Sequence, residues 1–157
     1  MEWNYVLSED LDDDSNERDP FTDRRLNPRI PSLDYHFSDR DQRHKFNLYS
    51  YSELPYGINL NLRLQAHTPQ PITAASCLIR NCAWKDTAYT SFDWRVARPF
   101  KVGEGKNVIP TVEMFNTFNN KNNVNPLTSA ALFDFSGFLR AGVGDPRQVQ
   151  LAVKFTF

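Results

Sequence analysis

The residues best suited to acid–base or metal chemistry in this sequence are its three histidines, His36, His44 and His67. They share no metal-ligand spacing, and their positions indicate no Ser–His–Asp or Cys–His arrangement. A glycine-rich phosphate-binding loop is also absent from the sequence. The sequence therefore predicts that the protein is not an enzyme, with no catalytic residue, no cofactor and no metal site.

An acidic run from Glu9 to Asp14 has the composition of a calcium-binding loop. An EF-hand counted from Asp10 requires glycine at its sixth position and glutamate at its twelfth. Ser15 and Phe21 stand at those positions, so the motif fails. The default interpretation is a solvated loop, and a loose surface ion site is the alternative.

Two cysteines, Cys77 and Cys82, lie close together in the sequence CLIRNC. The favoured interpretation is two unrelated thiols in a loop. A small disulfide loop is the alternative, which an oxidising extracytoplasmic compartment would permit. A zinc-binding pair is least favoured, because no second pair of ligands lies at a suitable spacing.

A stretch of basic residues could pair with lipid phosphates on the outer leaflet of the membrane. Its members are Arg24, Arg25, Arg29, Arg40, Arg43, His44 and Lys45. The neighbouring acids Asp23, Asp34, Asp39 and Asp41 balance that charge. We favour an ordinary loop of balanced charge.

The elements that carry these residues are predicted to be β-strands, because apolar and polar side chains alternate along the chain. The clearest run is 57–67, where Leu60, Leu62 and Leu64 share one face while Arg63 and Gln65 lie on the other. No helix keeps every second residue on one side. Similar alternation at 3–7, 45–54, 91–100, 108–118 and 148–157 gives about six strands. Pro110 fits worst, since proline deletes a ladder hydrogen bond, and predicts a bulge or a register beginning nearer Thr111.

Composition is compatible with a membrane sheet, although the 157 residues are 24% charged with a net charge of −1. That balance excludes a nucleic-acid partner driven by excess charge. The mean hydropathy of −0.57 and the lack of a membrane helix do not argue against a barrel, because alternating strands average to polar.

The amino-terminal sequence MEWNYVLSEDLDDD is no secretory signal. On the barrel interpretation the signal lies upstream of Met1, and the chain is a fragment or the product of a split gene.

Three features favour a membrane sheet over a soluble β-sandwich, which also alternates. The strands are long, about 10–13 residues, as a tilted crossing requires. Long polar side chains follow one face, as in a wet lumen, and aromatic residues cluster near strand ends, as in interfacial girdles. The lumen-facing candidates are Arg63, Gln65, Arg95, Glu113 and Lys154, and the aromatic residues are Trp3, Tyr5, Tyr56, Phe100, Phe118, Phe155 and Phe157.

The connections alternate between short and long, which is the third feature. Tight turns with Pro and Gly are predicted at 54–57 and 102–106, and long loops at approximately 8–44, 68–87 and 119–147. Outer-membrane barrels have short periplasmic turns and long outer loops. This parity predicts an antiparallel up-and-down meander with its carboxyl terminus in the periplasm.

The last eight residues, QLAVKFTF, resemble the assembly signal of outer-membrane barrels. Gln150, Phe155 and Phe157 fit that signal, whereas Ala152 stands where glycine is usual. Five further segments resemble the end of Oar-like TonB-dependent receptors, the type with a carboxypeptidase-regulatory-like domain. They are YVLSEDLDDDSN, DRDQRHKFNL, SELPYGINL, EMFNTFNNKN and GDPRQVQLAVKFTF. They occur in family order over nearly the whole chain.

The resemblance implies a function in substrate uptake across the bacterial outer membrane. This chain would form the carboxyl-terminal part of the barrel wall and is not expected to close on its own. The implied partners are outer-membrane lipid, the remaining barrel and plug domain, the barrel assembly machinery and, only through missing amino-terminal parts, the TonB system. Alternatives are a small oligomerising outer-membrane pore or anchor and a soluble β-sandwich binding module.

Overall fold

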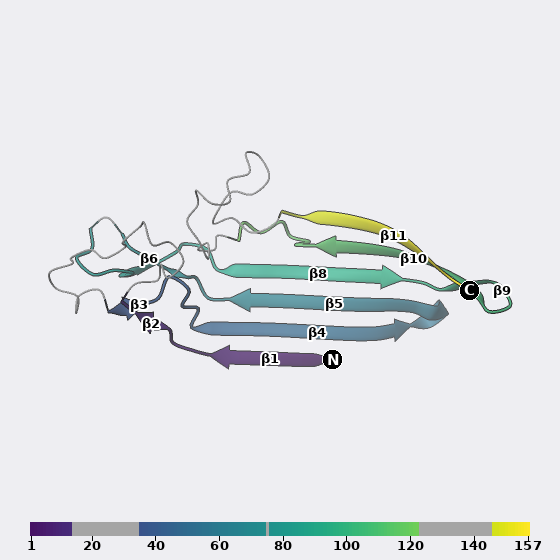
Figure 1. The fold of residues 1–157 in the computed structure, drawn as a ribbon, viewed down its shortest axis with the longest axis horizontal. Coiled ribbons are helices and arrows are strands. Elements are labelled where there is room, and N and C mark those ends of the chain that lie inside the picture. The colour runs from purple at the N-terminus through teal and green to yellow at the C-terminus, as the bar shows by residue number, and fades with distance from the viewer. Residues whose placement is uncertain (14–34, 75, 123–145) are drawn as a thin grey trace.

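One antiparallel sheet dominates the computed structural model, which describes residues 1–13, 35–74, 76–122 and 146–157. Six strands follow one another in the order β1-β4-β5-β8-β10-β11, and a short β9 also pairs with β10 (Figure 1). Their bounds are β1 Glu2–Leu7, β4 His44–Leu54, β5 Ile58–His67, β8 Tyr89–Ala97, β9 Phe100–Gly103, β10 Lys106–Phe115 and β11 Gln148–Thr156. Each neighbour along this path is also the next long strand in sequence. The predicted all-β antiparallel meander is therefore confirmed.

The strand with the clearest alternation in sequence, β5, lies at the centre of this sheet between β4 and β8. Five of the six strands on the path are 9–11 residues long, slightly shorter than predicted. The first, β1, has 6 residues. In the described residues no α-helix is present, and none of their helical segments is long and apolar enough to cross a membrane.

The two predicted tight turns join strands at one end of the sheet. Pro55–Gly57 forms a single 3-10 turn between β4 and β5, with Tyr56 and Gly57 at φ 65° and 71°. Glu104 and Gly105 connect β9 to β10, and Gly105 has φ 68°. These left-handed conformations match the right-handed twist of the flanking strands, and glycine adopts them without a steric penalty.

The long connections all begin and end at the opposite end of the sheet. The register pairs Leu7 with His44 and His67 with Tyr89, while Phe115 pairs with Gln148. Two small ribbons lie at that end (Figure 1): β2 Leu11–Asp12 with β3 His36–Phe37, and β6 Pro71–Ile72 with β7 Ala83–Trp84. The predicted parity of short turns and long loops is confirmed at every junction that the structure describes.

Pro110 lies within β10 without a bulge toward β11, because the register there runs unbroken from Asn107 to Phe115. The Pro110 carbonyl accepts a hydrogen bond from the Arg98 N–H at 3.2 Å. In an antiparallel strand the N–H and C=O of one residue point the same way. The missing N–H of Pro110 thus faces the break between β8 and β9, and pairing with β8 begins at Thr111.

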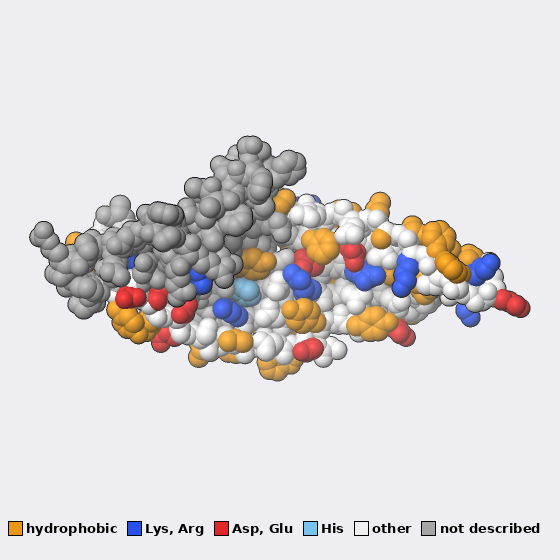
Figure 2. All heavy atoms as spheres, in the orientation of Figure 1, with side chains coloured by type: hydrophobic (Ala, Val, Ile, Leu, Met, Phe, Trp, Pro, Cys, Tyr) orange, Lys and Arg blue, Asp and Glu red, His pale blue; other side chains and the backbone are white. Residues whose placement is uncertain are grey.

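The register divides the main sheet into two faces of opposite character. The polar face carries Asn47, Tyr49, Asn61, Arg63, Gln65, Ser91, Asp93, Arg95, Thr111, Glu113, Gln150 and Lys154. The apolar face carries Trp3, Phe46, Leu48, Leu60, Leu62, Leu64, Phe92, Trp94, Val96, Val112, Met114, Leu151, Val153 and Phe155. Figure 2 shows charged side chains of both signs gathered over the central strands of one face.

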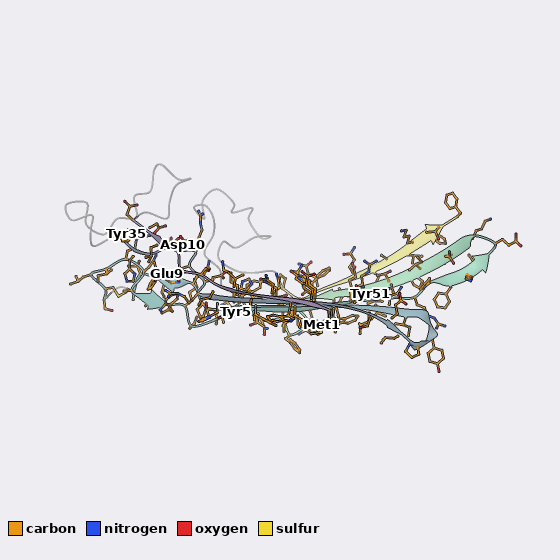
Figure 3. The ribbon with its side chains drawn as sticks, turned by 90° about the horizontal axis from the view of Figure 1, so that it is seen from below. Met1, Tyr5, Glu9, Asp10, Tyr35 and Tyr51 are labelled. Carbon is orange, nitrogen blue, oxygen red and sulfur yellow. A yellow bond between two sulfur atoms is a disulfide. The ribbon has the colours of Figure 1, made fainter. Side chains whose placement is uncertain are left out.

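The main sheet is a single layer, and Figure 3 shows β10 and β11 bending away from the plane of the other strands. Among the described residues, Ala97 and Pro71 are the buried apolar residues. The buried side chains are mostly polar. On the apolar face the edge strands are exposed, with Leu151 at 76% and Trp3 at 65%, and the apolar residues of the central strands β5 and β8 are half-buried. The usual arrangement, in which the apolar face of a sheet is covered by another layer, is not present in the described part of the chain.

Candidate functional site

All five residues predicted to face a lumen share the polar face. Arg63 pairs in register with Asp93, and Arg95 pairs with Glu113. Gln65 is two residues from Arg63, and Lys154 lies opposite Ile109, four residues from Glu113 on the same side of β10. The structure brings these side chains from β5, β8, β10 and β11 onto one surface, as period-two alternation requires. Whether that surface lines a lumen remains a prediction.

Asp93 is the centre of the hydrogen-bond network on this face. Its Oδ2 lies 3.0 Å from Arg63 Nε, and its Oδ1 accepts bonds from Ser91 Oγ and from the Asn116 N–H, both at 2.8 Å. The Asp93 side chain is 9% exposed, whereas that of Arg63 is 47% exposed. Burial of a carboxylate is tolerated here because its oxygens have these partners.

The network continues across β5 to β4. Arg63 Nη2 donates to Gln65 Oε1 at 2.8 Å, and Gln65 Nε2 donates to Asn47 Oδ1 at 3.3 Å. A row of polar side chains thus crosses three strands from Asp93 to Asn47. These contacts are between residues on the same or neighbouring strands, where cross-strand pairs meet.

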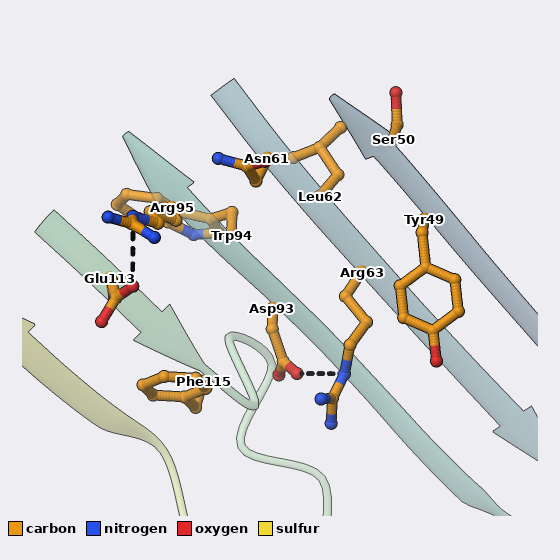
Figure 4. Close-up of a pocket in the computed structure, with 10 residues that line it drawn as sticks. All are labelled: Tyr49, Ser50, Asn61, Leu62, Arg63, Asp93, Trp94, Arg95, Glu113 and Phe115. Atoms are coloured by element: carbon orange, nitrogen blue, oxygen red, sulfur yellow. Dashed lines mark ion pairs between the residues drawn. The ribbon is translucent and has the colours of Figure 1, made fainter. Parts of the chain in front are cut away.

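A second ion pair lies beside the first, between Arg95 Nε and Glu113 Oε1 at 3.3 Å (Figure 4). Both pairs line a depression of about 210 Å³ whose wall also includes the rings of Tyr49 and Phe115. A neighbouring depression of about 360 Å³ shares Arg63 and Asp93 and extends toward Gln148 and Gln150. The surface is polar, aromatic and of both charges, which suits contact with a polar solute or a protein segment.

An asparagine cluster ends the polar face at the side of the long loops. Asn122 Oδ1 accepts from the Thr90 N–H at 2.9 Å, and Asn122 Nδ2 donates to the Thr90 carbonyl at 3.2 Å. The Asn116 side chain makes two bonds of 3.0 Å to the Asn120 backbone: its Nδ2 donates to the carbonyl, and its Oδ1 accepts from the N–H. The sequence predicted the end of a strand and the start of a long loop in this FNTFNNKN segment, and no hydrogen-bond cluster. Its dense asparagines, which readily bond nearby backbone, were the signal for this role.

The residues of the terminal signal lie on and after β11, which pairs with β10 along its whole length. Gln150 and Ala152 pair with Glu113 and Thr111 on the polar face, and Phe155 pairs with Val108 on the apolar face. Phe157 follows the strand and is fully exposed. Recognition of this segment by the assembly machinery stays a prediction.

Three described residues of the acidic run and one of the basic stretch contact specific partners. The Asp12 carboxylate pairs with Arg80, and the Asp10 N–H donates to Asp41 Oδ1 at 2.9 Å. Arg43 Nη2 lies 3.2 Å from Glu9 Oε1. In the described ranges no group of His, Cys, Asp or Glu is arranged to hold a metal. Arg24, Arg25 and Arg29, with Asp14, Asp23 and Asp34, lie outside the described residues.

Cys77 and Cys82 form a disulfide. The favoured interpretation of two unrelated thiols is therefore wrong, and the alternative is correct. Sequence spacing alone did not distinguish them, because two cysteines five residues apart can lie in a loop with or without a bond between them. The three histidines lie on separate elements: His36 in β3, His44 in β4 and His67 in β5.

The described polar face offers ion pairs, amides and aromatic rings. Binding along the polar face is the chemistry that this arrangement supports. Comparison of the chain with protein-family models, with curated proteins and with solved structures found no match.

Proposed function

We propose that this chain forms part of the wall of a bacterial outer-membrane β-barrel, in a TonB-dependent receptor that takes up a substrate across that membrane. One observation carries the proposal: a single-layer antiparallel sheet exposes its apolar face and forms its hydrogen-bond network on its polar face. This is the reverse of a soluble sheet, whose apolar face packs against a second layer. It is the arrangement expected for strands with lipid outside and water inside.

The exposed apolar residues support contact with lipid. On the edge strand β11, Val153, Leu151 and Phe155 are 58%, 76% and 68% exposed. Even the leucines of the central strand β5 are only partly covered by their neighbours. Contact with hydrocarbon removes such surface from water, which is favourable by about 25 cal/mol per Å². Strands of 9–11 residues have the length of a tilted bilayer crossing.

The loop arrangement supports an orientation. The tight turns at Pro55–Gly57 and at 104–105 would lie in the periplasm with the carboxyl terminus, and the long loops outside the cell. The rest of the wall would pair with the two outermost strands, β1 and β11, each of which has one partner strand in the described sheet. The resemblance to Oar-like receptors supports the more specific assignment to a TonB-dependent receptor with a plug.

Alternating fluorescent labels along β5 test the lipid-facing assignment. Single cysteines at Leu60, Leu62 and Leu64, and at the interleaved Asn61, Arg63 and Gln65, are labelled with bimane in proteoliposomes that contain brominated lipids. The native cysteines are joined in a disulfide and do not compete for label. Quenching should follow the leucine positions and spare the polar positions. Equal quenching at both sets, in chain that is recovered in the membrane fraction, would contradict the proposal.

A further inference from the structure

Arg80 is one of the largest fully buried side chains among the described residues, with 2% of its surface exposed. It lies within the segment that the Cys77–Cys82 disulfide closes, in the connection between β5 and β8. Its guanidinium contacts the connection between β1 and β4. Nη2 donates to the Asp12 carbonyl at 2.6 Å and pairs with the Asp12 carboxylate. Nη1 lies 3.9 Å from Asp39 Oδ1. An arginine from one loop is thus enclosed by acids of another.

Its neighbour Asn81 makes a second set of contacts in the same direction. Asn81 Nδ2 donates to the Phe37 carbonyl at 2.6 Å and to Asp39 Oδ1 at 2.7 Å. The Thr73 side chain also fixes the position of Asn81, because the Asn81 N–H donates to Thr73 Oγ1 at 2.9 Å. Asn81 has φ 52°, a left-handed conformation that asparagine tolerates better than most residues. With this turn, two consecutive side chains reach one partner surface.

That partner surface is the β2–β3 ribbon and the turn after it. Three backbone N–H groups of this surface are hydrogen-bonded within it. The Asp10 N–H donates to Asp41 Oδ1, the Ser38 N–H donates to the Asp10 carbonyl, and the Asp41 N–H donates to the Ser38 carbonyl. Lys85 of the second connection also lies near Asp39. Burial lowers the pKa of the Lys85 ammonium below its usual value, and the attraction of Asp39 opposes that shift.

We propose that the Cys77–Cys82 segment is a disulfide-closed clasp that fastens the β5–β8 loop onto the β2–β3 ribbon through Arg80 and Asn81. Closing the short ring removes backbone freedom that would otherwise be lost when both side chains reach their partners. The two loops would then act as one rigid unit while the disulfide is intact. The inference goes beyond the proposed function and does not rest on it, because none of these contacts involves the apolar face.

Hydrogen exchange of the full chain, in the folded oligomer isolated in detergent micelles, tests the clasp. Folded wild-type chain is treated with a phosphine, which takes oxygen from water to become its oxide while the disulfide gains two hydrogens as two thiols. The amides of Asp10, Ser38 and Asp41 should then exchange about tenfold faster or more, as local opening becomes easier. The double variant Cys77→Ser/Cys82→Ser should give the same result. Amides of β5 serve as the control for a folded sheet.

Two further variants separate the clasp from a disulfide that acts only locally. Arg80→Ala should reproduce most of the effect, and reduction of that variant should add little, because the two changes act on one contact. Leu78→Ala is the matched control, since Leu78 lies in the same ring and is 87% exposed; it should leave exchange unchanged. Complete reduction, verified by mass, that accelerates only residues 76–82 overturns the proposal.

Discussion

Arg63 and Asp93 lie directly opposite each other on β5 and β8, with Arg63 Nε 3.0 Å from Asp93 Oδ2. They lie on the face of the sheet that carries its buried residues Ser91, Asp93, Ala97 and Thr111. The charged pair is accompanied by Ser91 and Asn116, which donate to the same carboxylate. Polar contacts, and not an apolar core, therefore hold this face together.

Removal of the Asp93 carboxylate should destabilise the sheet more than removal of the neighbouring acid. Asp93→Ala deletes the acceptor of three donors at a buried position and should lower the free energy of unfolding by about 2–3 kcal/mol. Glu113→Ala removes a pair whose Arg95 side chain is 52% exposed, so it should cost at most about 1 kcal/mol. Urea titration of the chain in micelles, followed by tryptophan fluorescence at one protein concentration, measures both. Equal losses would show that Asp93 is not the centre of the network.

Charge on the apolar face should impair membrane insertion, whereas charge on the polar face should not. Leu62 lies between Ser50 and Trp94 on the apolar face, and Gln65 lies on the polar face of the same strand. Leu62→Arg should disfavour insertion by roughly 2–4 kcal/mol if it faces lipid near the midplane, and Gln65→Lys should be tolerated. The inserted fraction is measured by protease protection in liposomes. The reverse order would mean that the two faces are assigned the wrong way round.

The isolated chain should not be a stable monomer in a membrane. Six strands lie on the path of the main sheet, whereas single-chain bacterial barrels begin at about eight. In hydrocarbon each unpaired backbone group at an open edge costs several kcal/mol, and edges recruit other strands.

The test refolds the chain in detergent and measures mass together with heat-modifiable migration on a gel. Oligomers, aggregation or degradation are expected. A heat-modifiable oligomer of defined size would favour the alternative of a small self-completing pore. A monomer that resists unfolding would instead mean that the sheet completes itself.

The asparagine cluster should protect the loop end of β8. Asn122 is 2% exposed and bonds both backbone groups of Thr90, so Asn122→Ala should cost about 1–2 kcal/mol locally. Hydrogen exchange at the Thr90 amide should accelerate correspondingly. Lys121→Ala is the matched control at the adjacent exposed position, and should change nothing. Unchanged exchange at Thr90 in the Asn122 variant would show that the cluster does not hold the strand end.

Local pattern was enough to predict the six long strands of the main sheet, the tight turns and the side of the sheet on which each strand residue lies; it did not predict the short strands β2, β3, β6 and β7 in the long loops. Period two assigns Arg63 and Leu62 to opposite faces whatever the partner strands are. The glycine at 105 and the Pro–Tyr–Gly sequence predict where the chain reverses, because backbone sterics are local. The five polar candidates therefore share a face as the alternation required.

Only the tertiary structure decided which residues contact one another, because register and loop packing join positions far apart in sequence. Pro110 needed no bulge toward β11, since its missing N–H falls where β8 is interrupted before β9. The burial of Arg80 against Asp12 depends on a contact across 68 residues. Alternation carries no information on such contacts: it reports which side a residue faces, and long-range packing determines what it meets there.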